Sequence, residues 1–223
     1  MKYTKLILLL IVLALFSSCK EDSTTGPDTD PNDLGVPIGD YMPTKKGSKW
    51  EYRFNYNGNI GDDVLTVVGT RKFDSGTFVE FEEVVNDQAP TKSYRRFENG
   101  KYYGLTPDGT SSYIGDFVLL LLDQTANKGD KWEKISAIKD SKMRDSSLYK
   151  LELFDKLDTY KVNGVTYSDV LVMNTDIYIQ TEAGSQIKLY ENVYYYARNV
   201  GIIKIMLSTE VESVVHELIK YTP

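Results

Sequence analysis

Apolar and polar residues alternate with a period of two through much of the chain from residue 50 onward. In the clearest case, the aromatic residues Trp50, Tyr52, Phe54 and Tyr56 alternate with polar residues. Successive side chains of a β-strand point to opposite faces of the sheet, so this spacing places all four rings on one face. The pattern predicts a strand with one buried aromatic face.

Turn signals separate these short apolar segments. Asn-Gly pairs occur at residues 57–58, 99–100 and 163–164, and this pair favours hairpins because both residues tolerate positive φ. A two-residue turn at the last pair would set Val162 opposite Val165. It would also set Tyr160 opposite Tyr167 on the same face. Short strands joined by turns indicate an antiparallel meander.

Two segments do not follow this pattern. Residues 117–122 form a continuous apolar run, which is consistent with a doubly buried strand or with a short helix. Residues 136–147 show no clear period and are interpreted as a loop. No segment sustains the three- and four-residue apolar spacing of a long amphipathic helix. The expected fold class is therefore all-β with little helix, in a strongly curved antiparallel sheet that forms a half-barrel or an open barrel.

A short internal repeat also occurs. Residues 46–51 (KGSKWE) resemble residues 128–133 (KGDKWE). The repeat is consistent with two equivalent halves of the domain. We favour the interpretation that one device is used twice, in which glycine turns the chain and tryptophan anchors the strand that follows.

The amino-terminal residues 1–18 have the organisation of an export signal. Lys2 and Lys5 precede an apolar run of residues 6–16, and small residues then lead to Cys19. As a helix this run rises about 16 Å, which is half of the ~30 Å hydrocarbon layer of a bilayer. The segment is therefore predicted to be a signal peptide and not a stable membrane span.

Residues 15–19 (LFSSC) resemble a bacterial lipobox, in which the cysteine becomes the first mature residue and carries diacylglycerol. The resemblance implies a lipid anchor at Cys19, because two acyl chains hold a protein firmly at a membrane. The alternative is a secretory signal with an unused thiol. Residues 20–22 (KED) resemble the export tag of Bacteroidota-type surface lipoproteins, which implies a location on the outer face of the outer membrane. A solvated acidic tether is the alternative.

Residues 19–40 are predicted to be a lipidated, flexible tether. They are rich in Asp, Thr, Pro and Gly and bury too little apolar surface to offset the entropy cost of ordering. The acidic spacing at residues 28–33 resembles a calcium loop but lacks its glycine and its final glutamate, so no metal site is expected. Residues 41–223 are then predicted to form a single β domain.

Composition excludes several classes of site. The formal net charge is −6, and removal of the signal would make it about −8, which argues against nucleic acid as a partner. With one histidine and one cysteine, the composition argues strongly against a disulfide framework, a Cys/His zinc site and a Cys-His dyad. Glycine patterns that cradle phosphates are absent, and no cofactor is expected.

Several segments in order resemble one group of bacterial proteins. They are residues 41–43 (YMP), 47–50 (GSKW), 129–132 (GDKW), 160–170 (YKVNGVTYSDV), 195–197 (YYA) and 200–204 (VGIIK). This series is similar to uncharacterised bacterial lipoprotein and periplasmic domains, which in turn resemble the half-barrel carriers of lipoproteins and lipids. The resemblance implies a long curved sheet around an apolar cavity. The helix expected to plug such a half-barrel is not evident here.

No residue is assigned a catalytic role. His216, the only histidine, would become a general base only if a serine and an aspartate converged on it, and a structural role is favoured. Glu82 and Glu83 are adjacent, so on a strand they point to opposite faces and form a poor acid–base pair. The protein is therefore not expected to be an enzyme.

Three functions remain for comparison. The first is a binding module whose concave face holds an amphiphilic or apolar ligand. Its ligand-binding candidates are Trp50, Tyr52, Phe54, Tyr56, Tyr160 and Tyr167. The second is a surface lipoprotein with a filled core that docks a protein or a glycan. The third and least favoured is an extracellular hydrolase.

Overall fold

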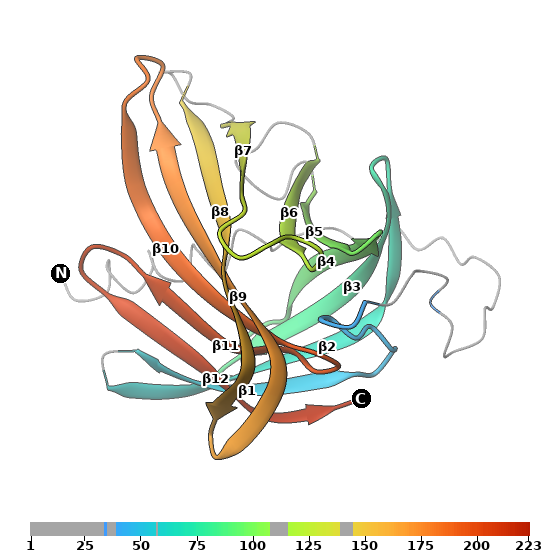
Figure 1. Ribbon diagram of the computed structural model, residues 1–223. Coiled ribbons are helices and arrows are strands. Elements are labelled where there is room, and N and C mark those ends of the chain that lie inside the picture. Colours follow the sequence, from blue (N-terminus) through green and yellow to red (C-terminus); the bar gives the residue numbers. More distant parts are fainter. Residues whose placement is uncertain (1–33, 35–38, 57, 108–115, 139–144) are drawn as a thin grey trace.

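The computed structural model describes residues 34, 39–56, 58–107, 116–138 and 145–223 (Figure 1). All regular elements in these residues are strands. They are β1 (Lys49–Tyr56), β2 (Asn59–Phe73), β3 (Gly76–Val85), β4 (Thr91–Glu98), β5 (Lys101–Thr106), β6 (Phe117–Asp123), β7 (Lys131–Ala137), β8 (Ser146–Val162), β9 (Val165–Gln180), β10 (Gln186–Ala197), β11 (Gly201–Ser208) and β12 (Ser213–Thr222). The predicted signal peptide, Cys19 and most of the predicted tether lie outside the described residues. Within the described residues, no helix is long and apolar enough to cross a bilayer.

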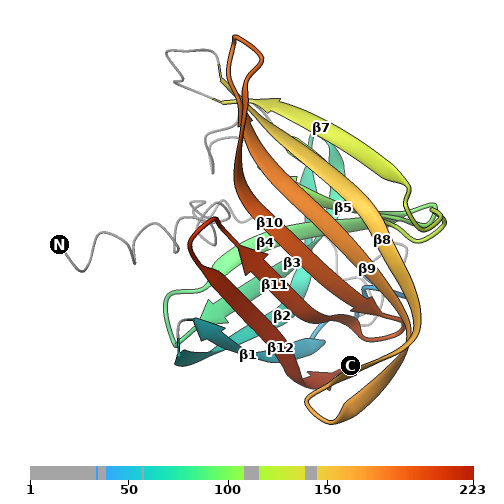
Figure 2. The same cartoon turned by 60° about the vertical axis from the view of Figure 1, so that its left-hand side comes forward.

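The twelve strands form one antiparallel sheet with the order β6-β5-β4-β3-β2-β1-β12-β11-β10-β9-β8-β7. Consecutive strands pair with each other except for β6 and β7, and β1 pairs with β12 to join the two halves of the meander. The sheet curls strongly, so its strands surround a common interior (Figures 1 and 2). The expectation of an all-β, strongly curved antiparallel sheet is therefore confirmed.

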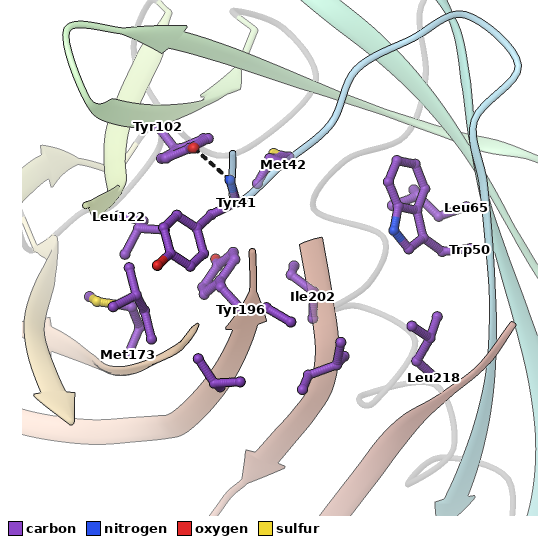
Figure 3. Close-up of a cluster of buried hydrophobic side chains, with 14 of the residues drawn as sticks. Tyr41, Met42, Trp50, Leu65, Tyr102, Leu122, Met173, Tyr196, Ile202 and Leu218 are labelled. Carbon is purple, nitrogen blue, oxygen red and sulfur yellow. Dashed lines mark hydrogen bonds between the residues drawn. The ribbon is translucent and has the colours of Figure 1, made fainter. Parts of the chain in front are cut away.

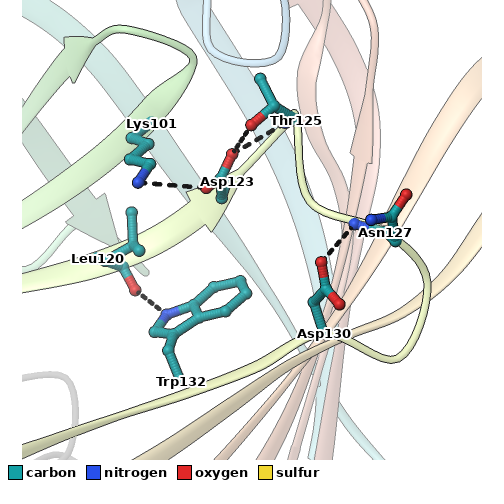
Figure 4. Close-up of polar contacts among 7 residues, drawn as sticks. All are labelled: Lys101, Leu120, Asp123, Thr125, Asn127, Asp130 and Trp132. Carbon is teal, nitrogen blue, oxygen red and sulfur yellow. Dashed lines mark hydrogen bonds and ion pairs between the residues drawn. The ribbon is translucent and has the colours of Figure 1, made fainter.

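The two edge strands, β6 and β7, approach each other at the seam of this barrel-shaped sheet. The Trp132 indole Nε1 on β7 donates a 2.9 Å hydrogen bond to the Leu120 carbonyl on β6 (Figure 4). Near the far end of β6, the Phe117 ring lies 5.1 Å from the Tyr149 ring of β8. Side chains thus join the seam. The apolar run at residues 117–122, for which a strand and a helix were both considered, is a strand.

The period-two pattern of β1 is confirmed. Trp50 and Tyr52 are buried, whereas Arg53 and Asn55 between the inner positions are exposed. The register shift in the pairing with β12 falls on β12, so the inner face of β1 stays continuous. All four predicted rings therefore share the concave face.

The predicted hairpin at residues 163–164 is also confirmed. Val162 pairs with Val165, and Tyr160 pairs with Tyr167. Both turn residues have positive φ, 48° at Asn163 and 83° at Gly164, as a tight hairpin turn requires.

The internal repeat is one structural device used twice. Gly47 donates its N–H to the Val67 carbonyl of β2, and Gly129 donates its N–H to the Leu153 carbonyl of β8. The two glycines have φ of 89° and 90°. Each turn leads into a strand, β1 or β7, whose tryptophan indole donates to a distant carbonyl. The favoured interpretation of the repeat is therefore confirmed.

Residues 39–42, which precede β1 and which we name the plug segment, place Tyr41 and Met42 in the interior of the sheet. The backbone N–H of Tyr41 donates to the Tyr102 hydroxyl at 2.8 Å, and Tyr41 and Met42 are 5% and 3% exposed. Figure 3 shows the Tyr41 ring between Tyr102, Leu122 and Tyr196. Burial raises the pKa of Tyr102 to about 12. The helix that the resemblance implied is not found among the described residues, and residues 39–42 form a turn in which the Met42 N–H donates to the Gly39 carbonyl.

Gly39 anchors the plug segment, so its replacement tests the role of this segment. A Cβ at residue 39 would lie 2.3 Å from the Tyr102 hydroxyl and 2.6 Å from the Phe97 ring. Gly39→Ala is expected to lower the free energy of unfolding by about 1–3 kcal/mol, as overpacking does in buried sites. Gly69→Ala is the control, because a Cβ there meets no atom within 4 Å. Equal thermal denaturation of the two variants would contradict this role.

Candidate ligand-binding site on the concave face

The sheet has two different ends, because all strands are antiparallel. Even-numbered strands end where the plug segment lies, and we name this the plug end. Odd-numbered strands end at the opposite side, the far rim. At the plug end the inward side chains are fully buried: Trp50, Phe81, Met173, Ile203 and Leu218. Toward the far rim, Val214 is buried, but five other inward side chains are only partly buried: Phe54, Tyr56, Val85, Ile205 and Leu207.

A group of ionisable side chains separates these two regions. Asp63 of β2, Glu83 of β3 and His216 of β12, which we name the polar layer, all project to the concave face. The register shows this, because Asp63 pairs with Tyr52, Glu83 pairs with Leu65 and His216 pairs with Phe54. Strands β3, β2, β1 and β12 are successive in the sheet, so this region brings one histidine and two carboxyls together inside it.

His216 and Asp63 form the most deeply buried part of the polar layer. Each is 3% exposed, and His216 Nδ1 lies 3.6 Å from Asp63 Oδ2. The Phe54 ring stacks on the imidazole at a centroid distance of 5.2 Å. Gly61 leaves room for this ring, because a Cβ at that position would lie 2.2 Å from Phe54. The histidine is therefore held between a carboxylate and an aromatic ring.

Glu83 holds its proton unusually tightly. Burial, the nearby charge of Asp63 and a hydrogen bond with Asp63 together raise the pKa of its carboxyl to about 8, and the positive charge of Arg95 opposes this rise. Two carboxyls this close cannot both ionise at low cost. The raised pKa of Glu83 therefore favours its protonated form at neutral pH.

Arg95 connects the polar layer with the plug segment. Its guanidinium lies 4.7 Å from the centre of the Phe81 ring, and Nη1 lies 3.8 Å from Met42 Sδ. Burial raises the pKa of Tyr52 and Tyr196, and the positive charge of Arg95 opposes this rise in both. Residues of β1, β4 and β10 thus meet across the interior.

Three buried polar atoms in this region lack a hydrogen-bond partner among the described residues. They are Asp63 Oδ1, His216 Nδ1 and Asn192 Oδ1. Asn192 lies on β10, two residues from Tyr194, toward the far rim. Leaving a buried polar atom unpaired is costly, so each such atom in a native structure needs an explanation.

The structure divides the four candidate residues of β1 into two pairs. Trp50 Nε1 donates to the Val200 carbonyl at 2.6 Å, and the Tyr52 hydroxyl donates to the Ile202 carbonyl at 2.9 Å. Both side chains therefore serve the core at the plug end. Phe54 and Tyr56 stay partly exposed on the concave face, where the Tyr56 hydroxyl donates to Glu212 Oε2.

Tyr160 and Tyr167 lie away from the polar layer. Tyr160 stacks on Tyr195 at a centroid distance of 4.5 Å and lies near the Lys204 ammonium. Lys204 pairs with Glu217 on the convex face of the sheet. The structure therefore does not bring Tyr160 and Tyr167 together with Phe54 and Tyr56.

The sequence analysis does not single out Asp63 and considers Glu83 only beside Glu82, although a signal for both inward carboxyls exists. Asp63 is in phase with the inward residues Leu65 and Val67, and Glu83 is in phase with Phe81. An acid at an inward position of an alternating strand is a candidate for a functional role. Within the described residues, no group of three or more His, Cys, Asp or Glu is placed to hold a metal ion.

No protein-family model matches the sequence, and comparison with curated proteins gives no match. Similar solved structures include two bacterial proteins. One is a predicted lipoprotein from Parabacteroides distasonis, with 15% identity, coverage of 83% of this chain and 100% of the other, and a TM-score of 0.56. The other is a predicted exported protein with a YmcC-like fold from Bacteroides fragilis, with 15% identity, coverage of 81% and 98%, and a TM-score of 0.50. The resemblance to bacterial lipoprotein domains with a curved sheet is thus confirmed at the level of the fold.

Proposed function

We propose that this protein is a non-catalytic, lipid-anchored protein of the bacterial cell envelope that holds an amphiphilic or apolar ligand against the concave face of its sheet. One observation carries this proposal. Inward apolar side chains are sealed at the plug end but remain partly exposed toward the far rim, at Phe54, Val85, Ile205 and Leu207.

Partial exposure of an inward apolar surface favours binding of an apolar group. Each square ångström of apolar surface removed from water contributes about 25 cal/mol. Small-molecule sites are typically concave and mostly apolar, with a few polar groups that fix orientation. The far-rim half of the concave face has this composition, because apolar residues surround a small polar layer.

The envelope location rests on the amino-terminal signals and on the two structural neighbours. The lipobox-like residues 15–19 support a lipid anchor at Cys19, and residues 20–22 support export to the cell surface. Of the neighbours, one is described as a lipoprotein and the other as an exported protein. Outer-membrane anchoring with surface exposure is therefore part of the proposal.

Binding of the neutral apolar probe N-phenyl-1-naphthylamine tests the proposed function. The wild-type protein is expected to enhance the fluorescence of this probe saturably. Leu207→Asp should weaken binding at least tenfold, because it places a charge on the apolar lining. Met206→Asp is the matched control, because its side chain lies on the opposite face of the same strand with a similar exposure. Absence of saturable binding to the wild type would contradict the proposal.

A different observation favours the alternative of docking to a surface protein or glycan. Three strongly exposed aliphatic residues lie beside turns of the far rim: Ile60 at 69%, Ile187 at 56% and Val211 at 86% exposure. Exposed apolar groups of this kind also mark interaction surfaces. Probe binding that is lost in Leu207→Asp but kept in Val211→Asp would favour the concave face over the rim.

A further inference from the structure

The polar layer has unused capacity to accept hydrogen bonds at the base of the apolar lining. Asp63 Oδ1 and His216 Nδ1 have no hydrogen-bond partner among the described residues, although both side chains are 97% buried. These are two separate side chains, from β2 and from β12, and His216 Nδ1 lies 3.6 Å from Asp63 Oδ2. Leaving a buried acceptor unpaired costs more free energy than a typical hydrogen bond contributes. Binding of a hydrogen-bond donor at this position would therefore be strongly favoured.

The surroundings identify the chemistry of that partner. Glu83 already shares a hydrogen bond with Asp63, and Arg95 is engaged by Phe81 and Met42. The unpaired Oδ1 atom belongs to the Asp63 carboxyl, whose ionised form can only accept hydrogen bonds. The position therefore suits a group that donates hydrogen bonds and disfavours a carboxylate or a phosphate.

The lining sets the orientation of such a ligand. Phe54 stacks on His216, and inward apolar residues follow toward the far rim on three strands: Val85 on β3, Leu207 on β11 and Val214 on β12. The polar residue Asn192 of β10 lies beside Leu207. A polar end at His216 would leave an attached hydrocarbon chain against the three apolar residues. The geometry thus fits an amphiphile with its polar end inward and its chain directed to the rim.

We propose that Asp63 and His216 form the head-group site of the ligand and that this site takes a hydrogen-bond donor, a hydroxyl or a protonated amine. The inference rests on the proposed function, because it assumes that the concave face holds an amphiphile. It adds the chemical class of the head group and the residues that recognise it.

Calorimetric titration with ten-carbon probes tests this assignment in the wild-type protein. 1-Decanol and decylamine carry donors, whereas decyl methyl ether has a similar chain and no donor. Both donor probes are expected to bind at least tenfold more tightly than the ether. A lead of decylamine over decanol would identify a cationic head group, and equal binding would identify a hydroxyl. Both results support a donor site.

Asp63→Asn should reduce the affinity for decylamine at least tenfold and leave the ether unchanged. Asp62→Asn is the matched control, because Asp62 is the adjacent residue, is exposed and pairs with Arg53 on the convex face. The comparison of the three probes in the wild type decides the question by itself if the Asp63 variant does not fold.

The outcomes separate the two proposals. Equal binding of decanol, decylamine and the ether to the wild type would overturn the head-group site while keeping the concave binding face. Absence of binding by all three probes, together with absence of N-phenyl-1-naphthylamine binding, would overturn both. An unchanged decylamine affinity in a folded Asp63→Asn variant would also overturn the assignment.

Discussion

Trp50→Ala is expected to lower the free energy of unfolding by about 3–5 kcal/mol, the range found when large buried aromatic residues are truncated. Trp50 is 2% exposed and packs against the rings of Phe81 and Tyr221. Its indole also donates to the Val200 carbonyl in the turn between β10 and β11. Truncation would therefore leave a cavity and an unpaired carbonyl at the plug end.

Chemical denaturation measures this effect, and two variants serve as references. Trp50→Phe keeps most of the ring packing but loses the hydrogen bond, so it should fall between Trp50→Ala and the wild type. Phe154→Ala removes a ring that is 51% exposed and should change stability much less. Similar denaturation midpoints for Trp50→Ala and Phe154→Ala would show that the plug end is not the stabilising centre of the fold.

Much of the fold could be predicted from local patterns, because every strand pairing except that of β1 with β12 joins strands that are adjacent in sequence. The ring alternation at residues 50–56 and the Asn-Gly turn at residues 163–164 both act within a few residues, and each has the predicted geometry. A meander pairs each strand with its neighbour in sequence, so these local signals are sufficient to define most of the sheet.

Features that depend on distant contacts could not be predicted in this way. The seam between β6 and β7 depends on a hydrogen bond from Trp132 to Leu120 across the closed sheet. The plug segment was assigned in part to a tether, because residues 39–42 are few and carry no periodic pattern. Their burial arises from Tyr102, which lies 61 residues away from Tyr41 along the chain.

The candidate site was predicted only in part for the same reason. Phe54 and Tyr56 could be placed on the concave face from the spacing of β1 alone. The polar layer arises because β2, β3 and β12 place Asp63, Glu83 and His216 beside one another, and β12 lies at the opposite end of the sequence. In the sequence Glu83 stands next to Glu82, whereas its partner in the folded protein is Asp63.

The protein is expected to lose stability as the pH rises from about 5 to about 8, and Glu83 is the expected cause. The pKa of this carboxyl is about 8 in the folded protein, compared with 4.5 for a free side chain. The folded state therefore binds its proton more tightly than the unfolded state. The stabilisation is complete below pH 4.5, decreases as the pH rises and is lost above pH 8.

The slope is about 1.4 kcal/mol per pH unit for one proton, so the loss between pH 5 and pH 7.5 is about 3 kcal/mol. Glu83→Gln cannot ionise and should remove this slope, which denaturation at a series of pH values would measure. Glu82→Gln is the control, because Glu82 lies on the opposite face of β3 and should keep the wild-type profile.

The Glu83→Gln variant also distinguishes a shared proton from simple burial. A glutamine at this position can still donate a hydrogen bond to Asp63, so the variant should match the wild type near pH 5 and exceed its stability near pH 8. If Glu83→Gln is instead destabilised equally at both pH values, the Glu83 carboxyl is ionised in the folded state. The hypothesis that it shares a proton with Asp63 would then be wrong. In that case the polar layer would carry a second full negative charge, and the preference for a cationic over a neutral head group should increase.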